Sequence, residues 1–291
     1  MSFPPEVYLI GAQKAGTTSL AYLLSQHPDI CVARTKEPHF FTTYLYRGLD
    51  WYKGNFSNYE NSVCLDASTT YAMAPLSENN SKKGRLEGVP QRIHSISSNA
   101  KFIYLLRNPI ERTYSAYWHY FNIGCEGKKF GEAIKNDFFY LDVSNYYGQL
   151  ALWLEYFSLD SFLFILFEDL KKNPAKVAEE CFQFMGVSSE NIKVKLEAPK
   201  NKSRSVNFVG RQCNRLFFTL DMWGHSHFAP SILRKTCKKL TTDFNKKIPP
   251  IDETDKLFLS EYFSEKNRQL AFLTGISLDQ WQVCSRNLVY N

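Results

Sequence analysis

The sequence predicts an α/β fold in which helices flank a mostly parallel sheet and the C-terminal third is mainly helical. Short, uninterrupted apolar runs such as 7–10 and 101–106 recur along the chain, which is typical of strands buried in a parallel sheet. Amphipathic segments such as 146–157 separate these runs, as the crossover helices of a parallel sheet require. A glycine-bounded turn at 11–16 joins the first run to a helix.

The expected strands are four to six residues long and cover 7–10, 30–33, 63–66, 101–106 and 162–167. The expected helices begin or end at recognisable residues, among them Pro28, Pro90, Pro109 and Gly186. These helices cover 17–26, 90–98, 110–121, 146–157, 174–185 and 253–272. The polar 77–88 and the basic 187–210 are expected to be loops, and 122–143 to be irregular or partly helical.

At 291 residues and 44% hydrophobic content the chain can bury a sizeable core, and 1–291 is expected to form a single domain. A net charge of +6 suits anionic small molecules but does not indicate nucleic acid as a partner. No apolar run approaches the ~20 residues that span a bilayer, and the N-terminal stretch lacks the pattern of a secretory signal. We therefore expect no transmembrane segment and a cytoplasmic protein, or alternatively a catalytic domain excised from a luminal protein.

The cysteines are scattered and number seven, so they cannot all pair. Free thiols in a reducing compartment are the preferred interpretation. One disulfide, for example between Cys213 and Cys237, stays open as an alternative.

The turn from Gly11 to Gly16, called here the phosphate loop, has the composition of an anion-binding turn. Between a strand and a helix, backbone N–H groups converge on a phosphate and the helix dipole adds about half a positive charge. The glycines have the spacing of a nucleotide triphosphatase P-loop, but Thr17 stands where that motif has its lysine, and Lys14 lies inside the turn. One interior lysine with the hydroxyls of Thr17 and Thr18 suits a single 5′-phosphate better than a magnesium triphosphate. A plain glycine turn is the alternative.

A second candidate phosphate contact follows the apolar run 101–106. Arg107 comes directly after this run, and Ser115 lies eight residues later on the helix that Pro109 opens. A guanidinium binds phosphate through two N–H groups, and a hydroxyl adds a further donor. No acidic residue ends this strand, where a P-loop kinase would hold magnesium. The sequence therefore favours a phosphate site without a metal, with a surface salt bridge of Arg107 as the alternative.

The 34–41 segment, RTKEPHFF, leaves the carboxyl end of the second expected strand, where ligands of open α/β sheets gather. It combines three basic residues, one of them a histidine, and a carboxylate with two aromatic residues. The stretch 44–60 that follows is rich in tyrosine and tryptophan and is expected to cover the site or to contact a substrate.

Three segments together resemble the sulfotransferases that use 3′-phosphoadenosine 5′-phosphosulfate (PAPS). GAQKAGTTSL is similar to their 5′-phosphosulfate loop, and FIYLLRNPIERTYSAYWHY is similar to their 3′-phosphate segment. KEPHFF is similar to the acceptor-site segment of the heparan-type carbohydrate branch and its bacterial relatives. YYGQLALWLEYF, FILFEDLKKNP and KNRQLAFLTG extend the resemblance over nearly the whole chain. The resemblance implies a P-loop-like fold, PAPS as co-substrate, adenosine 3′,5′-bisphosphate (PAP) as product, and no metal.

The resemblance also implies in-line transfer of a sulfuryl group to an acceptor hydroxyl or amine. Lys14 would stabilise the leaving oxygen, and Glu37 would act as the base, with His39 as the second candidate. An exposed loop carboxylate paired with a neighbouring cation is the alternative for Glu37. The residues expected to bind the donor are Lys14, Ala15, Gly16, Thr17, Thr18, Ser19, Arg107, Ser115, Lys202, Ser203 and Arg204. Of these, Lys202, Ser203 and Arg204 belong to a basic loop that is expected to close over the nucleotide.

The identity of the acceptor stays open at this stage. A sugar hydroxyl is the first hypothesis, and a carrier-bound polyketide or lipid-like hydroxyl is the alternative, with acceptor contacts expected from 40–59 and 223–228. Ala67 stands where some relatives carry lysine, and Gln149 where another branch carries histidine, which weakens the case for a heparan-like polysaccharide. The alternatives of another class are a P-loop nucleotide kinase and a non-catalytic nucleotide-binding module. Retention of Lys14 and Glu37 counts against the latter.

Overall fold

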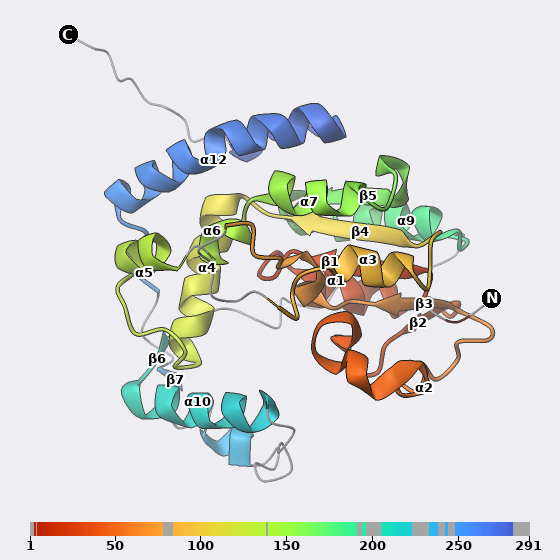
Figure 1. Ribbon diagram of the computed structural model, residues 1–291, viewed down its shortest axis with the longest axis horizontal. Helices are drawn as coiled ribbons and strands as arrows, with labels where there is room; N and C mark the ends of the chain where they lie inside the picture. Colours follow the sequence, from red (N-terminus) through yellow and green to blue (C-terminus); the bar gives the residue numbers. More distant parts are fainter. Residues whose placement is uncertain are drawn as a thin grey trace.

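The structure is a computed structural model that describes residues 3, 5–77, 84–137, 139–190, 194–195, 205–222, 233–237, 242–243 and 248–281. A five-stranded parallel sheet has the order β2–β3–β1–β4–β5 (Figure 1). The strands are β1 (Val7–Gly11), β2 (Ile30–Val32), β3 (Val63–Asp66), β4 (Lys101–Leu106) and β5 (Phe162–Leu166). All are apolar runs expected from the sequence, so the predicted parallel sheet is confirmed.

The strand order changes direction beside β1. The chain leaves β1 toward β2 and β3 on one side, whereas β4 lies on the other side of β1 and leads outward to β5. Ligands of open parallel sheets bind at the carboxyl ends of the strands at such a point. Leu9 pairs with Ile103 across β1 and β4. The turns that follow these strands, which carry Lys14 and Arg107, therefore come together at one edge of the sheet.

Helices flank the sheet, as the sequence predicts. They are α1 (Thr17–Leu24), α2 (Gly48–Lys53), α3 (Val89–His94), α4 (Pro109–Asn122), α5 (Phe130–Asn136), α6 (Phe139–Asp142), α7 (Tyr146–Leu154), α8 (Phe167–Lys172), α9 (Pro174–Met185), α10 (Phe208–Met222) and α12 (Glu253–Thr274). α1 packs against α9, and α12 packs against α7 and α4 (Figure 1). Strands β6 (Ser205–Val206) and β7 (Thr242–Asp243) pair antiparallel near α10, away from the main sheet (Figure 1). The described part of the C-terminal third is thus mainly helical.

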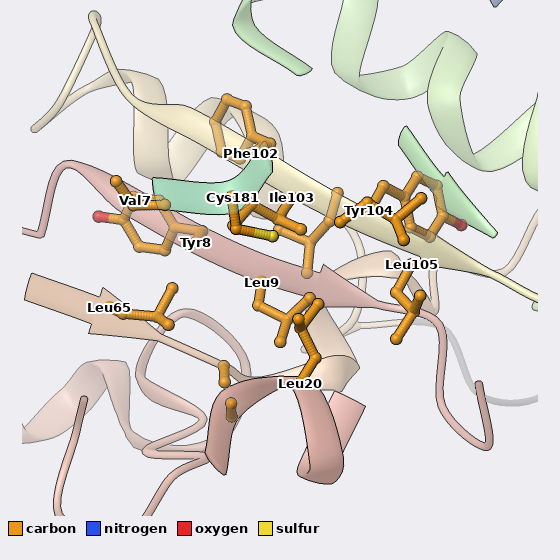
Figure 2. Packing of buried hydrophobic residues seen from close by; sticks show 14 of the residues in the cluster. Val7, Tyr8, Leu9, Leu20, Leu65, Phe102, Ile103, Tyr104, Leu105 and Cys181 are labelled. Carbon is orange, nitrogen blue, oxygen red and sulfur yellow. The ribbon is translucent and has the colours of Figure 1, made fainter. Parts of the chain in front are cut away.

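The core is built on the two central strands, β1 and β4 (Figure 2). Tyr8 and Phe102 stack with ring centres 5.8 Å apart, and both rings are fully buried. Phe102 also contacts Trp153 of α7 at 4.7 Å and Phe162 of β5 at 4.9 Å. This close packing gives the turns at the carboxyl ends of β1 and β4 a rigid base.

Some elements differ from the expectation. Residues 40–53, for which no helix was expected, form the π-helix η1 (Phe40–Tyr44), the 3₁₀-helix η2 (Leu45–Arg47) and α2. Phe167, expected to end a strand, is the first residue of α8. The loop expected over 187–210 is wrong at its end, because β6 and the start of α10 occupy 205–210.

Two findings bear on the expected compartment and thiols. None of the helices in the described ranges has the length and apolar character needed to cross a membrane. No disulfide joins the cysteines that the structure describes. The thiols of Cys213 on α10 and Cys237 are in hydrogen-bond contact.

Candidate active site

The phosphate loop turns sharply from β1 into α1, and its second glycine is required by both backbone and packing. Gly16 has a φ of +97°, a conformation that side chains other than hydrogen disfavour. A Cβ at this position would lie 2.9 Å from ring carbons of Phe167 in α8. A substitution would therefore strain the turn and displace α8 from the start of α1.

Two arginines hold the phosphate loop by its carbonyl oxygens. Arg107 Nη1 donates to Lys14 O at 3.1 Å, and Arg112 Nε donates to Gln13 O at 3.2 Å. Arg112 is fully buried, and its Nη1 also donates to Ser144 Oγ at 2.9 Å. Because guanidinium groups bind these carbonyl oxygens, the repulsion that the oxygens would exert on an anion is reduced. This bracing role of Arg112 was not apparent from the sequence.

Positive charge accumulates around the phosphate loop. Burial lowers the pKa of Lys14, and the charges of Arg107 and Arg112 lower it further. Burial also lowers the pKa of His119 on α4 to about 4, an effect that Lys14 and Arg112 increase, so this imidazole is neutral at pH 7. Clustered cations with perturbed pKa values are typical of a site that receives an anion. His119 was missed in the sequence, although its spacing of seven residues from Arg112 places both on one helix face.

Arg107 has a partner that a phosphate could replace. Its Nε and Nη2 donate to Glu111 Oε2 at 3.2 and 2.9 Å, and its guanidinium lies 5.0 Å from the ring centre of Phe167. The Glu111 side chain is 60% exposed, so this salt bridge is weak. Ser115 is half-buried about two turns further along α4, and the structure describes no contact between Arg107 and Ser115.

The other expected donor contacts differ in exposure. Ala15 and Thr17 are buried, whereas Thr18 and Ser19 are exposed on the first turn of α1. Ser19 N donates to Gly16 O at 3.0 Å, so its hydroxyl is the group left for a ligand. Outside the described residues lie the expected donor contacts Lys202, Ser203 and Arg204 and the expected acceptor stretch 223–228.

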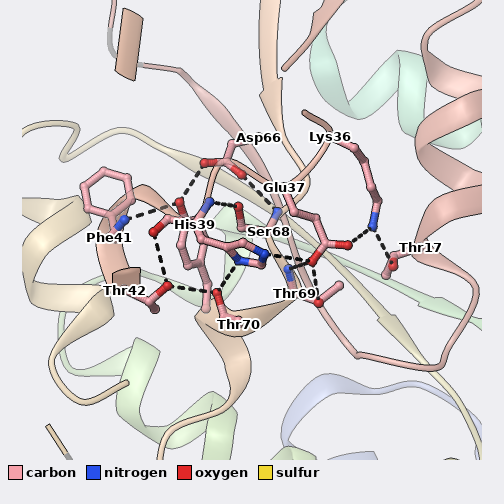
Figure 3. A network of polar contacts seen from close by, with 11 residues as sticks. Thr17, Lys36, Glu37, His39, Phe41, Thr42, Asp66, Ser68, Thr69 and Thr70 are labelled. Carbon is pink, nitrogen blue, oxygen red and sulfur yellow. Dashed lines mark hydrogen bonds and ion pairs between the residues drawn. The ribbon is translucent and has the colours of Figure 1, made fainter. Parts of the chain in front are cut away.

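Glu37 belongs to a polar network that reaches α1 (Figure 3). Its Oε1 accepts from Lys36 Nζ at 2.5 Å, and its Oε2 accepts from Thr69 Oγ1 at 2.8 Å. Lys36 Nζ also donates to Thr17 Oγ1 at 3.2 Å, so one lysine joins Glu37 to the first residue of α1. Burial would raise the pKa of Glu37, but the charge and hydrogen bond of Lys36 outweigh burial and hold this pKa below its usual value. Glu37 is therefore ionised at neutral pH and able to accept a proton.

His39 lies beside Glu37, with its Nε2 3.8 Å from Glu37 Oε2 (Figure 3). The other ring nitrogen, Nδ1, shares a hydrogen bond of 2.9 Å with Thr70 Oγ1, and the backbone N donates to Ser68 Oγ at 2.9 Å. Burial lowers the pKa of His39 although the carboxylate opposes this shift. The imidazole is therefore neutral near pH 7, which leaves it a second candidate for proton transfer.

Backbone strain gathers at the same residues. Lys14, Lys36 and His39 have φ values of 71°, 62° and 51°, and they are the non-glycine residues with positive φ in the part of the chain that the structure describes. Each such conformation costs about 1–2 kcal/mol. Surrounding contacts must hold it in place, and such residues cluster at functional sites. The strain supports the assignment of these three residues to one site.

The two departures from the heparan-type pattern make structural contacts. Ala67 is buried, and its N donates to Lys36 O at 3.1 Å. Gln149 is buried, with Oε1 accepting from Ala74 N at 3.0 Å and Nε2 donating to Ala74 O at 2.7 Å. Both positions thus serve the fold in this chain.

Across the described ranges, no group of three His, Cys, Asp or Glu side chains could hold a metal ion.

Comparisons with known proteins point to one family. The model of the family described as "Sulfotransferase domain" matches residues 4–217. Heparan sulfate glucosamine 3-O-sulfotransferase 6 of Mus musculus is 29% identical over 192 residues, which cover 63% of this chain and 52% of that protein. Bifunctional heparan sulfate N-deacetylase/N-sulfotransferase 3 of Mus musculus is 26% identical over 309 residues, which cover 95% of this chain and 31% of that protein. The chain therefore spans about half or less of these relatives.

A solved structure supports the fold. The crystal structure of a sulfotransferase from Alicyclobacillus acidocaldarius superposes with a TM-score of 0.65 at 22% identity, covering 96% of this chain and 99% of that one. At this identity the likeness establishes the arrangement of strands and helices.

Proposed function

The chain belongs to the sulfotransferase domain family, and from this we propose that it transfers a sulfuryl group from PAPS to an acceptor hydroxyl. One observation carries the proposal: Lys36 contacts both Thr17 at the phosphate loop and Glu37 in the 34–41 segment. Candidate groups for the donor and the acceptor therefore meet at the switch point of the sheet. Family membership counts against a P-loop kinase, and the retained Lys14 and Glu37 favour an enzyme over a binding module.

The donor-binding residues fit a nucleotide with separate 3′- and 5′-phosphates. Arg107 would exchange its exposed salt bridge with Glu111 for the 3′-phosphate, with Ser115 as a further donor. The phosphate loop and the hydroxyls of Thr17 and Thr18 would hold the 5′-phosphate at the positive end of the α1 dipole. When bound, PAPS supplies a sulfuryl group that is activated by its leaving phosphate.

The transfer itself requires a cation at the leaving oxygen and a base at the acceptor. We assign Lys14 to the oxygen that bridges sulfur and phosphorus, where its charge would stabilise the negative charge that develops on this oxygen as its bond to sulfur breaks. Glu37 takes the proton of the acceptor hydroxyl as that oxygen bonds to sulfur, and PAP leaves with the former bridging oxygen. Lys36 would stabilise charge on the sulfuryl oxygens. His39, 3.8 Å from Glu37, is the alternative base.

A sugar is the acceptor that the surroundings favour. The names of the relatives refer to heparan sulfate and its glucosamine. Close in sequence to the 34–41 segment, the guanidinium of Arg47 lies 5.2 Å from the ring centre of Tyr44 and 5.1 Å from that of Trp51. Aromatic rings stack on sugar faces, and an arginine binds acidic groups on them. A carrier-bound or lipid-like hydroxyl is the alternative acceptor.

We also propose that residues 1–291 form one sulfotransferase domain. The packing of α12 on α4 and α7 supports this, since the C-terminal helix shares a core with the first half of the chain. Trp281 Nε1 also donates to Glu168 Oε2 at 3.2 Å, next to the site.

Calorimetry with PAP tests the donor assignment. Binding that is unchanged by magnesium and far tighter than the binding of ATP is the expected result. A preference for magnesium-bound ATP would contradict the assignment and would favour a nucleotide kinase.

A further inference from the structure

Asp66, the last residue of β3, has a fully buried carboxylate that joins three segments (Figure 3). Its Oδ2 accepts hydrogen bonds from Tyr52 OH of α2 and Tyr71 OH of η3 (Thr69–Ala72), each at 2.7 Å. Its Oδ1 accepts from Ser68 N at 2.9 Å in the turn after β3. One side chain therefore ties α2, η3 and this turn together.

Ser68 and Tyr71, which donate to Asp66, also form hydrogen bonds with the 34–41 segment. Ser68 Oγ accepts from His39 N at 2.9 Å, and Tyr71 OH accepts from Phe41 N at 3.4 Å. The left-handed backbone of His39 depends on such contacts, because a residue with a φ of 51° is not held there by its own preference. Asp66 thus supports the backbone on both sides of residue 40 through intermediaries.

The surroundings of Asp66 offer hydrogen bonds but, among the described residues, no contacting cation. The groups that face it are Ser68, Tyr52 of α2, Tyr71 of η3 and Tyr8 of β1. Burial raises the pKa of Asp66 to about 6, although the hydrogen bonds favour the ionised form. Burying a carboxylate without a counter-ion is costly. The ionised carboxylate therefore depends on its three hydrogen bonds to offset the cost of its burial.

We propose that ionised Asp66 is a positioning residue for the transfer step, which through Ser68 and Tyr71 holds the 34–41 segment so that Glu37 and His39 face the acceptor. This inference rests on the proposed function. The contacts described for Asp66 include no residue of the phosphate loop, so we expect PAP binding to be retained when its charge is lost. When the pH falls through about 6, Asp66 binds a proton. One carboxyl oxygen then becomes a donor and the negative charge is lost, so the three hydrogen bonds to Asp66 weaken and transfer slows.

The variant Tyr52→Phe gives the sharpest test, because Tyr52 touches Asp66 through its hydroxyl and contacts neither candidate base. Without the Tyr52 hydroxyl, the ionised carboxylate of Asp66 accepts one hydrogen bond fewer, so its pKa rises. The acid limb, which is the pH range in which the transfer rate falls on acidification, therefore shifts to higher pH by about 0.5–1 unit. The rate is measured with saturating PAPS and heparan sulfate as acceptor. Tyr140→Phe is the matched control, since that buried tyrosine also donates to a carboxylate, Glu126 Oε2 at 3.1 Å, and the acid limb of this variant does not move. An acid limb that does not move in Tyr52→Phe contradicts the proposal.

The variant Asp66→Asn separates positioning from a general structural role. The amide can still accept from Ser68 N, but it places N–H donors against two tyrosine hydroxyls that also donate. We expect kcat at pH 7.5 to fall by about tenfold or more. The acid limb near pH 6 disappears and PAP binding is retained, whereas the midpoint of thermal unfolding falls because two buried hydroxyls lose their acceptor. A loss of PAP binding in parallel with the loss of kcat would assign Asp66 a general structural role and overturn the proposal.

Histidine ring signals in NMR spectra provide a readout that needs no acceptor. Asp66→Asn and Ser68→Ala should shift the ring signals of His39 and change its titration. The ring of His27, which bonds Ser188 O at 2.7 Å far along the chain, serves as the internal control and should not respond. Unchanged His39 signals would overturn the inference whatever the acceptor. A wild-type protein that neither binds PAP nor transfers sulfate would instead refute the proposed function.

Discussion

Replacing Arg107 by alanine should weaken PAP binding chiefly through the 3′-phosphate. The Arg107 side chain is 20% exposed and already oriented by Lys14 O and Phe167, so a phosphate would meet a preformed pair of donors. Each hydrogen bond between charged groups contributes about 1.5–3 kcal/mol. Displacing the exposed Glu111 costs at most about 1 kcal/mol. The net loss of about 3 kcal/mol corresponds to a rise of about 10²-fold in Kd.

The variant Glu111→Gln tests the same reasoning by removing the carboxylate that the 3′-phosphate would displace from Arg107. Without its carboxylate partner, Arg107 no longer has to leave a salt bridge, so PAP should bind up to about fivefold tighter. Adenosine 5′-monophosphate, which lacks the 3′-phosphate, should bind Glu111→Gln as it binds the wild type. Calorimetry at one fixed salt concentration compares both ligands on all three proteins. If Arg107→Ala weakens both ligands equally, the 3′-phosphate assignment is refuted.

Three further substitutions test the phosphate loop and the base. Lys14→Ala should reduce transfer by about 10²-fold or more while the fold survives; near-normal turnover would exclude its role at the leaving oxygen. Glu37→Gln should slow the chemical step by about 10²-fold with PAP binding retained, and an unaffected rate would transfer the role of base to His39. Gly16→Ala should lower the free energy of unfolding by about 2 kcal/mol or more and abolish PAP binding. Gly186→Ala, also at positive φ (+79°) but with open space around it, should cost only the backbone strain of about 1 kcal/mol.

The sheet and the phosphate loop could be predicted because their signals are local. Runs such as 7–10 and 102–106 are apolar throughout, and glycines bound the turn at 11–16. Parallel pairing then brings the ends of β1 and β4 together, which explains why Lys14 and Arg107 were expected in one site and lie in contact. The roles assigned to them remain predictions.

The rest of the site depends on contacts that the sequence does not reveal. Phe40 stacks on Tyr52 with ring centres 4.3 Å apart, and this contact between residues twelve positions apart is not apparent from the local sequence. The network of Asp66 joins residues of three separate elements. In the sequence, Asp66 is recognisable only as the last residue of an expected strand, so the network could not be predicted. The burial of Arg112 under the phosphate loop likewise follows from the packing of α4 and could not be read from its charge.

The central claim is sulfuryl transfer, and the most direct measurement is transfer of radiolabelled sulfate from PAPS to heparan sulfate, its desulfated form and a panel of other sugars in the presence of EDTA. The account predicts labelled glycan, release of PAP in equal amount, and loss of both in Lys14→Ala. Tight PAP binding without transfer to any sugar or other hydroxylated acceptor would contradict it and would identify the chain as a nucleotide-binding module.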